Sequence, residues 1–208
     1  MSYSLNEVEA TAKRAARGAG YSWGLSEEAG KATRWLCAHG LDGVGALCVL
    51  LEQGLADDLL PNAPQDLSSN RNSQRKICPL LAGAALSDFS AQRELPVSMQ
   101  KLAVPMLILP FVASVARRLR LCLVVNCGDA VFSTDGVRLR AAGVLPEKAG
   151  EVTITAGDIT GDETAICTRA SPSAESWDLL NSFARRTYAP ATEESRLRGA
   201  GAGLSDND

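Results

Sequence analysis

A polar stretch in the middle of the chain is the feature that most constrains the fold. Residues 61–76, PNAPQDLSSNRNSQRK, contain almost no apolar side chain and are dense in Pro, Asn and Ser. This composition is typical of a loop or linker, because it offers little surface to bury and many turn-forming residues. We expect a helical part at residues 1–60 and an α+β part at 77–188. At 208 residues, the two parts fit in one compact domain.

The first helix is marked at both of its ends. Ser4 followed by Glu7 forms a capping box, in which the serine side chain accepts a hydrogen bond from the backbone of the first turn. Apolar residues then recur at three- and four-residue spacing until Gly18 and Gly20 interrupt the pattern.

Two more helices are expected before the polar stretch. The second is predicted to begin at Ser26, with Glu27 and Glu28 in its first turn. The third, a helix or one arm of a helical hairpin, spans residues 43–55. It is apolar on nearly all sides, so we expect it to be buried.

The sequence pattern of the second part of the chain indicates a sheet with helices packed on it. Asp135-Gly136 is a strong turn dipeptide between two apolar or β-branched runs, so it predicts a hairpin. A helix is expected from Pro110 to Arg118, and another after Ser171-Pro172 whose apolar face covers the sheet. The remaining expected elements are strands near 77–86, 119–127, 151–155 and 164–169, and a buried segment at 102–109. The fold class is therefore α+β, with an N-terminal helical part followed by a mixed or antiparallel sheet.

Charge and hydropathy exclude two classes of partner. The 21 basic and 24 acidic residues are spread along the chain without a basic block, so nucleic acid is not expected to bind. The most apolar run, residues 102–116, is too short for a membrane span and is interrupted by Pro105 and Pro110. With no secretory signal at the N-terminus, we expect a cytoplasmic protein without a membrane partner.

The cysteines and the single histidine limit the chemistry. Six cysteines include no CxxC pair, which favours reduced, mostly buried thiols and predicts neither a metal nor another cofactor. One of these thiols acting as a nucleophile is the alternative. His39 is placed in the last turn of a helix just before Gly40, where it complements the helix dipole. Hydrolases that need an imidazole are therefore disfavoured.

Two glycine-rich stretches are the candidate site. Residues 17–30, RGAGYSWGLSEEAG, place two aromatic side chains and two carboxylates around a helix connection. Residues 196–208, RLRGAGAGLSDND, combine exposed backbone amides with two arginines that suit a carboxylate or a phosphate. The GAGAG string has no strand before it and no helix after it, so it is not a dinucleotide fingerprint. The alternatives are ordinary packing and surface charge for the first stretch, and a solvated C-terminus for the second.

These two stretches also carry a resemblance. RGAGYSWGLSEEAGKATRWL near the start and YAPATEESRLRGAGAGLSDND at the end resemble a proteobacterial family of about this length that is known only as a domain of unknown function. The resemblance covers essentially the whole chain. It implies no activity, cofactor or catalytic residue, but it favours ordered ends that meet.

We therefore hypothesise that the Gly-rich C-terminal segment, residues 189–208, folds back onto the connection between the first two helices. The predicted acid-base residues are Glu27, Glu28 and Glu194. The predicted substrate-binding residues are Tyr21, Trp23, Arg196, Arg198, Gly199 and Gly201.

The chemistry expected at this site is that of carboxylates and guanidinium groups. A lyase, isomerase or hydratase that acts on a small anionic metabolite would use it in this way. A non-catalytic ligand-binding protein, an accessory subunit of a metabolic enzyme and a structural dimer stay open as alternatives. A homo-oligomer or a complex with a partner enzyme is compatible with each of them.

Overall fold

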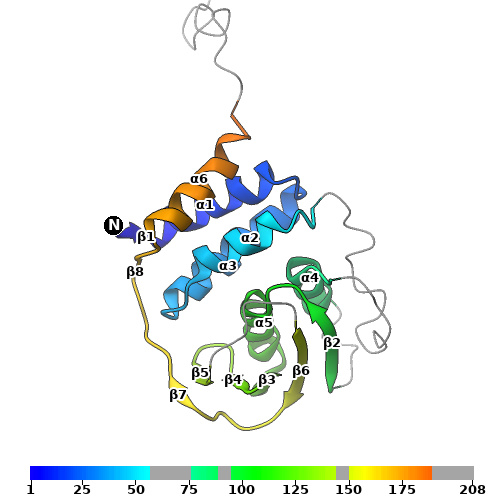
Figure 1. The fold of residues 1–208 in the computed structure, drawn as a ribbon. Coiled ribbons are helices and arrows are strands. Elements are labelled where there is room, and N and C mark those ends of the chain that lie inside the picture. Colours follow the sequence, from blue (N-terminus) through cyan, green and yellow to red (C-terminus); the bar gives the residue numbers. More distant parts are fainter. Residues whose placement is uncertain (57–75, 89–94, 144–149, 189–208) are drawn as a thin grey trace, which may run out of the picture.

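The computed structural model describes residues 1–56, 76–88, 95–143 and 150–188 (Figure 1). The helices of this part are α1 (Leu5–Gly18), α2 (Trp23–Ala38), α3 (Gly43–Glu52), α4 (Pro79–Asp88), α5 (Leu109–Leu119), α6 (Ala174–Arg185) and the short 3-10 helix η1 (Pro105–Ile108). The larger sheet contains β2 (Val97–Leu102), β3 (Leu123–Cys127), β4 (Ala130–Thr134), β5 (Leu139–Ala142), β6 (Gly150–Ala156) and β7 (Asp162–Glu163). A second, two-stranded sheet pairs β1 (Tyr3–Ser4) with β8 (Arg169–Ala170).

The larger sheet has the order β2-β6-β3-β4-β5-β7, and every described pair in it is antiparallel. Side chains alternate between its faces, so that Leu123 and Val125 of β3 and Val152 and Ile154 of β6 are buried. The predicted hairpin is confirmed, because β4 pairs with β5 across the Asp135-Gly136 turn. The α+β class predicted from the sequence is correct.

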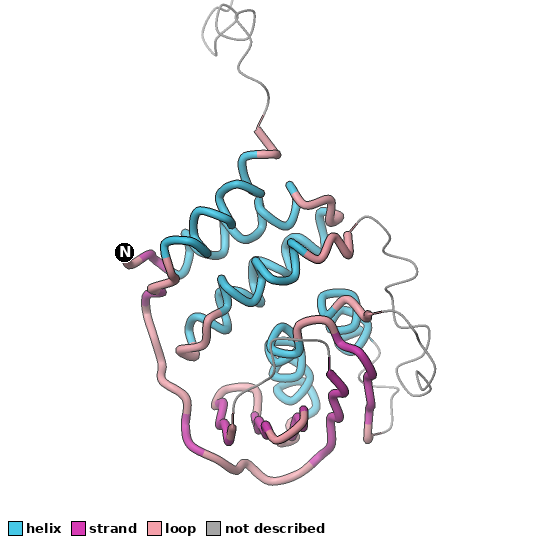
Figure 2. Tube along the Cα trace, in the orientation of Figure 1, coloured by secondary structure: helices cyan, strands magenta, loops and turns pink. Residues whose placement is uncertain are grey.

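The molecule is layered, with helices on one side and the sheet on the other (Figure 2). Helices α4 and α5 lie between the sheet and α2, and α1, α3 and α6 complete the helical side (Figure 1). The predicted buried segment at 102–109 is confirmed, with Leu107 and Ile108 fully enclosed. No helix in the described ranges combines the length and the apolar character that a bilayer crossing requires.

The predicted capping of α1 is confirmed, but α2 begins earlier than the sequence indicated. Ser4 Oγ accepts a hydrogen bond from Glu7 N at 3.1 Å, which is the serine half of the predicted capping box. In α2 the N-cap is Ser22, whose Oγ accepts from Leu25 N, and not Ser26. Ser26 is instead buried, and its hydroxyl donates to the carbonyl of Tyr21. The two glutamates that follow are therefore one turn further from the helix start than predicted.

The strand predicted near 77–86 is wrong. Only Ile77 makes a bridge, to Leu102, and the chain then enters α4 at Pro79. A proline in the first helical turn sacrifices no hydrogen bond, and the Leu and Ala residues that follow are strong helix formers. The sequence analysis predicted no strand at the residues of β2.

The strand predicted at 164–169 is also wrong, because this stretch belongs to a longer connection. We call residues 157–173, which lead from the sheet back to the helices, the return segment (Figure 1). Only its short strands β7 and β8 pair with other strands. Between them, Cys167 N donates to Ala38 O at 2.8 Å, which fastens the segment to the end of α2.

Helix α6 does not cover the sheet as predicted. It packs along α1 on the opposite side of the molecule (Figure 1). Trp177 stacks on Tyr3 with ring centroids 3.8 Å apart, and further along α6 the Phe183 backbone presses against Gly18. The apolar face of α6 was identified correctly, but an amphipathic pattern does not specify which apolar surface it meets.

We predict that Gly18→Ala destabilises the protein by about 2 kcal/mol, because the added methyl group would occupy the position of the Phe183 carbonyl. Gly24→Ala is the matched control, since nothing lies within 4 Å of the methyl group there. Alanine is the better helix former, so this variant should gain up to about 1 kcal/mol. Urea unfolding measures both changes. Equal effects of the two substitutions would contradict the tight α1–α6 contact.

The hairpin turn gives a prediction about pH. The Asp135 carboxylate accepts hydrogen bonds from the backbone N–H groups of Arg138 at 2.8 Å and Val137 at 3.0 Å. Mainly because of the Arg138 backbone hydrogen bond, the pKa of Asp135 falls to about 2. A depressed pKa stabilises the fold above the unfolded value, near 3.8, and this stabilisation disappears as the pH falls through about 2.

We therefore expect Asp135→Asn to be less stable than the parent by about 1 kcal/mol at pH 7. The difference should shrink as the pH is lowered from 5 towards 2, since the parent carboxylate becomes protonated. Chemical denaturation at several pH values measures it. Asp129→Asn, at another exposed turn, should change stability by less than about 0.5 kcal/mol. If the difference in stability between the parent and Asp135→Asn stays constant down to pH 2, the ionised Asp135 carboxylate is not its cause.

Candidate functional site

The two aromatic residues of the predicted site lie in different surroundings. Tyr21 is buried in the core, and its hydroxyl lies 3.5 Å from the Cys78 sulfur. Trp23 is 66% exposed, and the guanidinium of Arg17 lies 4.9 Å from the centre of its ring. Of these two side chains, only Trp23 is available at the surface.

Glu27 and Glu28, two of the three predicted acid-base residues, line one groove between α2, α4 and α5, of about 490 Å³. Each carboxylate already has a cationic partner at 2.7 Å, Lys13 for Glu27 and Lys31 for Glu28. The hydrogen bond from Lys13 lowers the pKa of Glu27. A lowered pKa makes a carboxylate a weaker base and removes the proton that a general acid needs.

The rest of the predicted site lies outside the described residues. This holds for Glu194, Arg196, Arg198, Gly199 and Gly201. The last described residue is Tyr188, and Arg14 of α1 donates a hydrogen bond to its hydroxyl at 3.1 Å. The described part of the chain therefore ends with the Tyr188 side chain against α1, the helix that leads into the Tyr21–Trp23 connection.

His39 occupies the position predicted for it. It is the C-cap of α2, its Nδ1 lies 2.9 Å from Trp35 O, and its ring stacks on Trp35. The six cysteines, all in the described residues, are free thiols, and four of them are buried. Within the described ranges, no three His, Cys, Asp or Glu side chains are grouped so that they could hold a metal ion.

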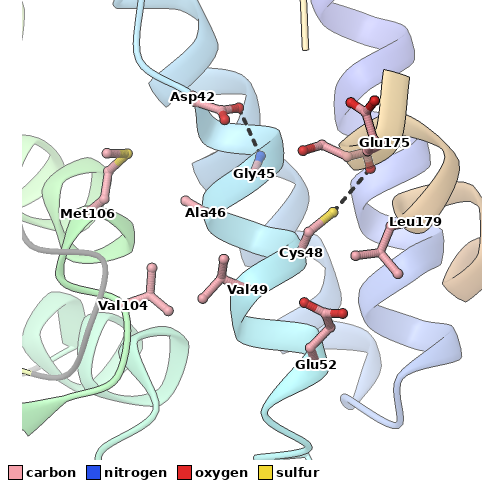
Figure 3. Close-up of a pocket in the computed structure, with 11 residues that line it drawn as sticks. Asp42, Gly45, Ala46, Cys48, Val49, Glu52, Val104, Met106, Glu175 and Leu179 are labelled. Atoms are coloured by element: carbon pink, nitrogen blue, oxygen red, sulfur yellow. Dashed lines mark hydrogen bonds between the residues drawn. The ribbon is translucent and has the colours of Figure 1, made fainter. Parts of the chain in front are cut away.

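A second groove, which the sequence did not predict, lies between α3, α6 and the segment around η1 (Figure 3). We call it the α3–α6 groove, and its volume is about 360 Å³. Its apolar walls are Ala46 and Val49 from α3, Leu179 from α6, and Val104 and Met106 opposite (Figure 3). This volume is within the range of pockets that hold small organic ligands.

Three carboxylates stand around this groove. Asp42 caps α3 by accepting a hydrogen bond from Gly45 N at 2.9 Å. Glu52 ends the same helix, ten residues later, which places it about 15 Å along the helix axis. Glu175 lies in the first turn of α6, where a backbone N–H at the helix N-terminus lowers its pKa. All three side chains belong to exposed residues and no described lining residue is basic.

The groove also contains a thiol, which is not suited to nucleophilic chemistry. Cys48 lies on α3 and its Sγ donates to Ser176 O at 3.2 Å (Figure 3). Burial raises the pKa of Cys48 to about 12. Because the thiolate is the reactive form, this thiol is inert near neutral pH.

The sequence carries no specific signal for this groove. Helix α3 is apolar nearly all round, yet it carries Val49, which is 37% exposed. Single exposed apolar residues are ordinary on protein surfaces, so this one does not by itself mark a binding site. The contribution of α6 was missed, because α6 was expected on the sheet.

Comparison with known proteins gives a partial match. Residues 3–94 match a protein family described as "Protein of unknown function (DUF3726)". This confirms, for that part of the chain, the resemblance to a domain of unknown function. The matched span includes α1 to α4 but neither α6 nor any described strand of the larger sheet. No curated protein and no solved structure matches the sequence.

Proposed function

We propose that the protein binds a small organic cation in the α3–α6 groove. The observation that supports this most directly is the composition of the described lining, which has three carboxylates, an apolar floor and no basic side chain. Carboxylates that stay ionised attract an ammonium group, and the apolar walls accept the hydrocarbon part of the same molecule.

Binding without catalysis is the form of this function that the groove supports. A general base, general acid or nucleophile needs a pKa close to the working pH. The pKa of Cys48 is raised by burial and that of Glu175 is lowered at the helix N-terminus, so both move away from neutrality. The proposed function is therefore that of a ligand-binding or sensing protein, one of the alternatives the sequence left open.

The spacing of the carboxylates indicates an elongated ligand. Asp42 and Glu175 stand at the helix-start end of the groove and Glu52 at the other end of α3 (Figure 3). An aliphatic chain with an amine at each end would place its methylene groups on Val49 and Met106. It would then pair one ammonium with each end of the groove.

We predict that octane-1,8-diamine raises the melting temperature of the protein, whereas octanedioate, which has the same length and opposite charge, does not. The double variant Glu52→Gln/Glu175→Gln should bind the diamine about tenfold more weakly by calorimetry, since it removes an ionic contact at each end. Glu27→Gln, in the other groove, is the control and should not change the affinity. Equal stabilisation by the dioate, or an equal loss in Glu27→Gln, would contradict the proposal.

A second candidate keeps the site predicted from the sequence. Its support is the Arg14–Tyr188 contact, which holds the last described residue against α1, and the groove that Glu27 and Glu28 share. In this proposal Arg196 and Arg198 anchor a carboxylate-bearing metabolite, and Glu27, Glu28 or Glu194 moves a proton.

For this candidate we expect a carboxylate metabolite to stabilise the full chain and not a chain that ends at Tyr188. Ending there keeps the hydrogen bond to Arg14, so the two chains should have similar melting temperatures without ligand. The variant Arg196→Ala/Arg198→Ala should lose the stabilisation as the shortened chain does. Thermal-shift measurements on a set of carboxylates test this. A carboxylate that stabilises the full chain and the shortened chain equally would place its site elsewhere.

A further inference from the structure

Two cysteines that are 130 positions apart in the sequence line one groove. Cys37 lies near the end of α2, and Cys167 belongs to the return segment. The groove they share has a volume of about 410 Å³ and lies where α2 ends and α3 begins. This site is separate from the α3–α6 groove, although Asp42 borders both.

The Cys37 sulfur is held at the N-terminus of α3. The backbone N–H groups of Gly43 and Val44 there favour its thiolate and so oppose the rise in pKa that burial causes. A Cβ atom at position 43 would lie 3.3 Å from the sulfur and closer still to the backbone of Thr33, so glycine leaves the room that this approach needs. Backbone N–H groups at a helix start stabilise a thiolate, as they do in many redox proteins.

The return segment carries Cys167 to this place and fixes it there. Cys167 N donates to Ala38 O, the carbonyl next to Cys37, at 2.8 Å. Two residues earlier, Ala165 lies against Gly40. The segment therefore runs antiparallel to residues 38–40, with Cys167 beside the end of α2. Cys167 is half-buried, so reagents in solution reach its thiol, whereas Cys37 lies deeper.

We propose that Cys37 and Cys167 are a redox pair, which closes to a disulfide when the protein meets a small disulfide oxidant and opens again on reduction. The bond would join the end of α2 to the return segment. Its formation depends on the geometry of the groove that Cys37 and Cys167 share and not on the proposed ligand.

The reaction proceeds in two exchanges. The Cys167 thiolate attacks one sulfur of glutathione disulfide, which breaks that S–S bond and releases one glutathione thiolate. The Cys37 thiolate then attacks the Cys167 sulfur and releases the second glutathione thiolate. Two protein thiols are oxidised, one glutathione disulfide is reduced to two glutathione molecules, and the two protons lost by the cysteines are taken up by the released thiolates.

The surroundings of Cys37 make the second exchange depend on pH. Burial raises the pKa of Cys37, the backbone N–H groups of Gly43 and Val44 oppose this effect, and the negative charge of Asp42 raises the pKa further. Since the thiolate of Cys37 is needed for closure, the rate of ring closure should increase as the pH is raised from 7 to 9.

The test uses the full chain, reduced and then incubated with glutathione disulfide at pH 8. The remaining thiols are blocked with N-ethylmaleimide, the intact mass is measured, and a non-reducing digest identifies linked peptides. We expect a monomer that has lost two of its six thiols without retaining glutathione, and one linked peptide pair that contains Cys37 and Cys167.

Three variants separate this result from a general reactivity of thiols. Cys37→Ser should retain one glutathione on Cys167, because serine cannot complete the second exchange. Cys167→Ser should form no disulfide with Cys37. Because Cys167 is half-buried, this variant should keep the core intact, and it can be tested even if Cys37→Ser does not fold. Cys122→Ser removes the other half-buried thiol and should behave as the parent. Glutathione left on Cys167 in the parent, a bond to any other cysteine, or a disulfide between two copies would overturn the proposal.

Discussion

The contact between the first and the last described helix is the constraint on which the rest of the structure depends. Helix α6 can lie against α1 only because Gly18 has no side chain where the Phe183 carbonyl passes. At the other end of the pair, Tyr3 stacks on Trp177 and β1 pairs with β8. The chain thus leaves the helices, builds the sheet and returns, and the return segment and the α3–α6 groove both follow from that path.

Most of the helices and the central strands could be predicted because their signals are local. The Ser4 cap, the Pro110 helix start and the Asp135-Gly136 turn depend only on residues a few positions away. The errors at 77–86 and 164–169 have another cause. In both, a short apolar or β-branched run was interpreted as a strand, although only contact with distant residues decides whether such a run joins a sheet.

The candidate sites were harder to predict, because each groove is formed by segments far apart in the sequence. Glu27 and Glu28 were identified as neighbours of a groove, but their lysine partners lie on another helix in one instance and a turn away in the other. The α3–α6 groove needs Glu175 beside Asp42, a pairing of positions more than 130 residues apart. Only the fold brings these carboxylates together. A local pattern indicates side-chain chemistry, but it does not show which side chains share a surface.

The family match covers only one helix of the α1–α6 pair. The matched region, residues 3–94, contains α1 but not α6, which contacts one whole side of α1 in this protein. A polypeptide reduced to that region would leave this side of α1 uncovered, and with it the ring of Tyr3. It would need a substitute helix from elsewhere, which a separate chain could supply by the same parallel packing. Residues 3–94 of this chain are in this sense an incomplete folding unit, completed by a helix that begins about 80 residues further along the chain.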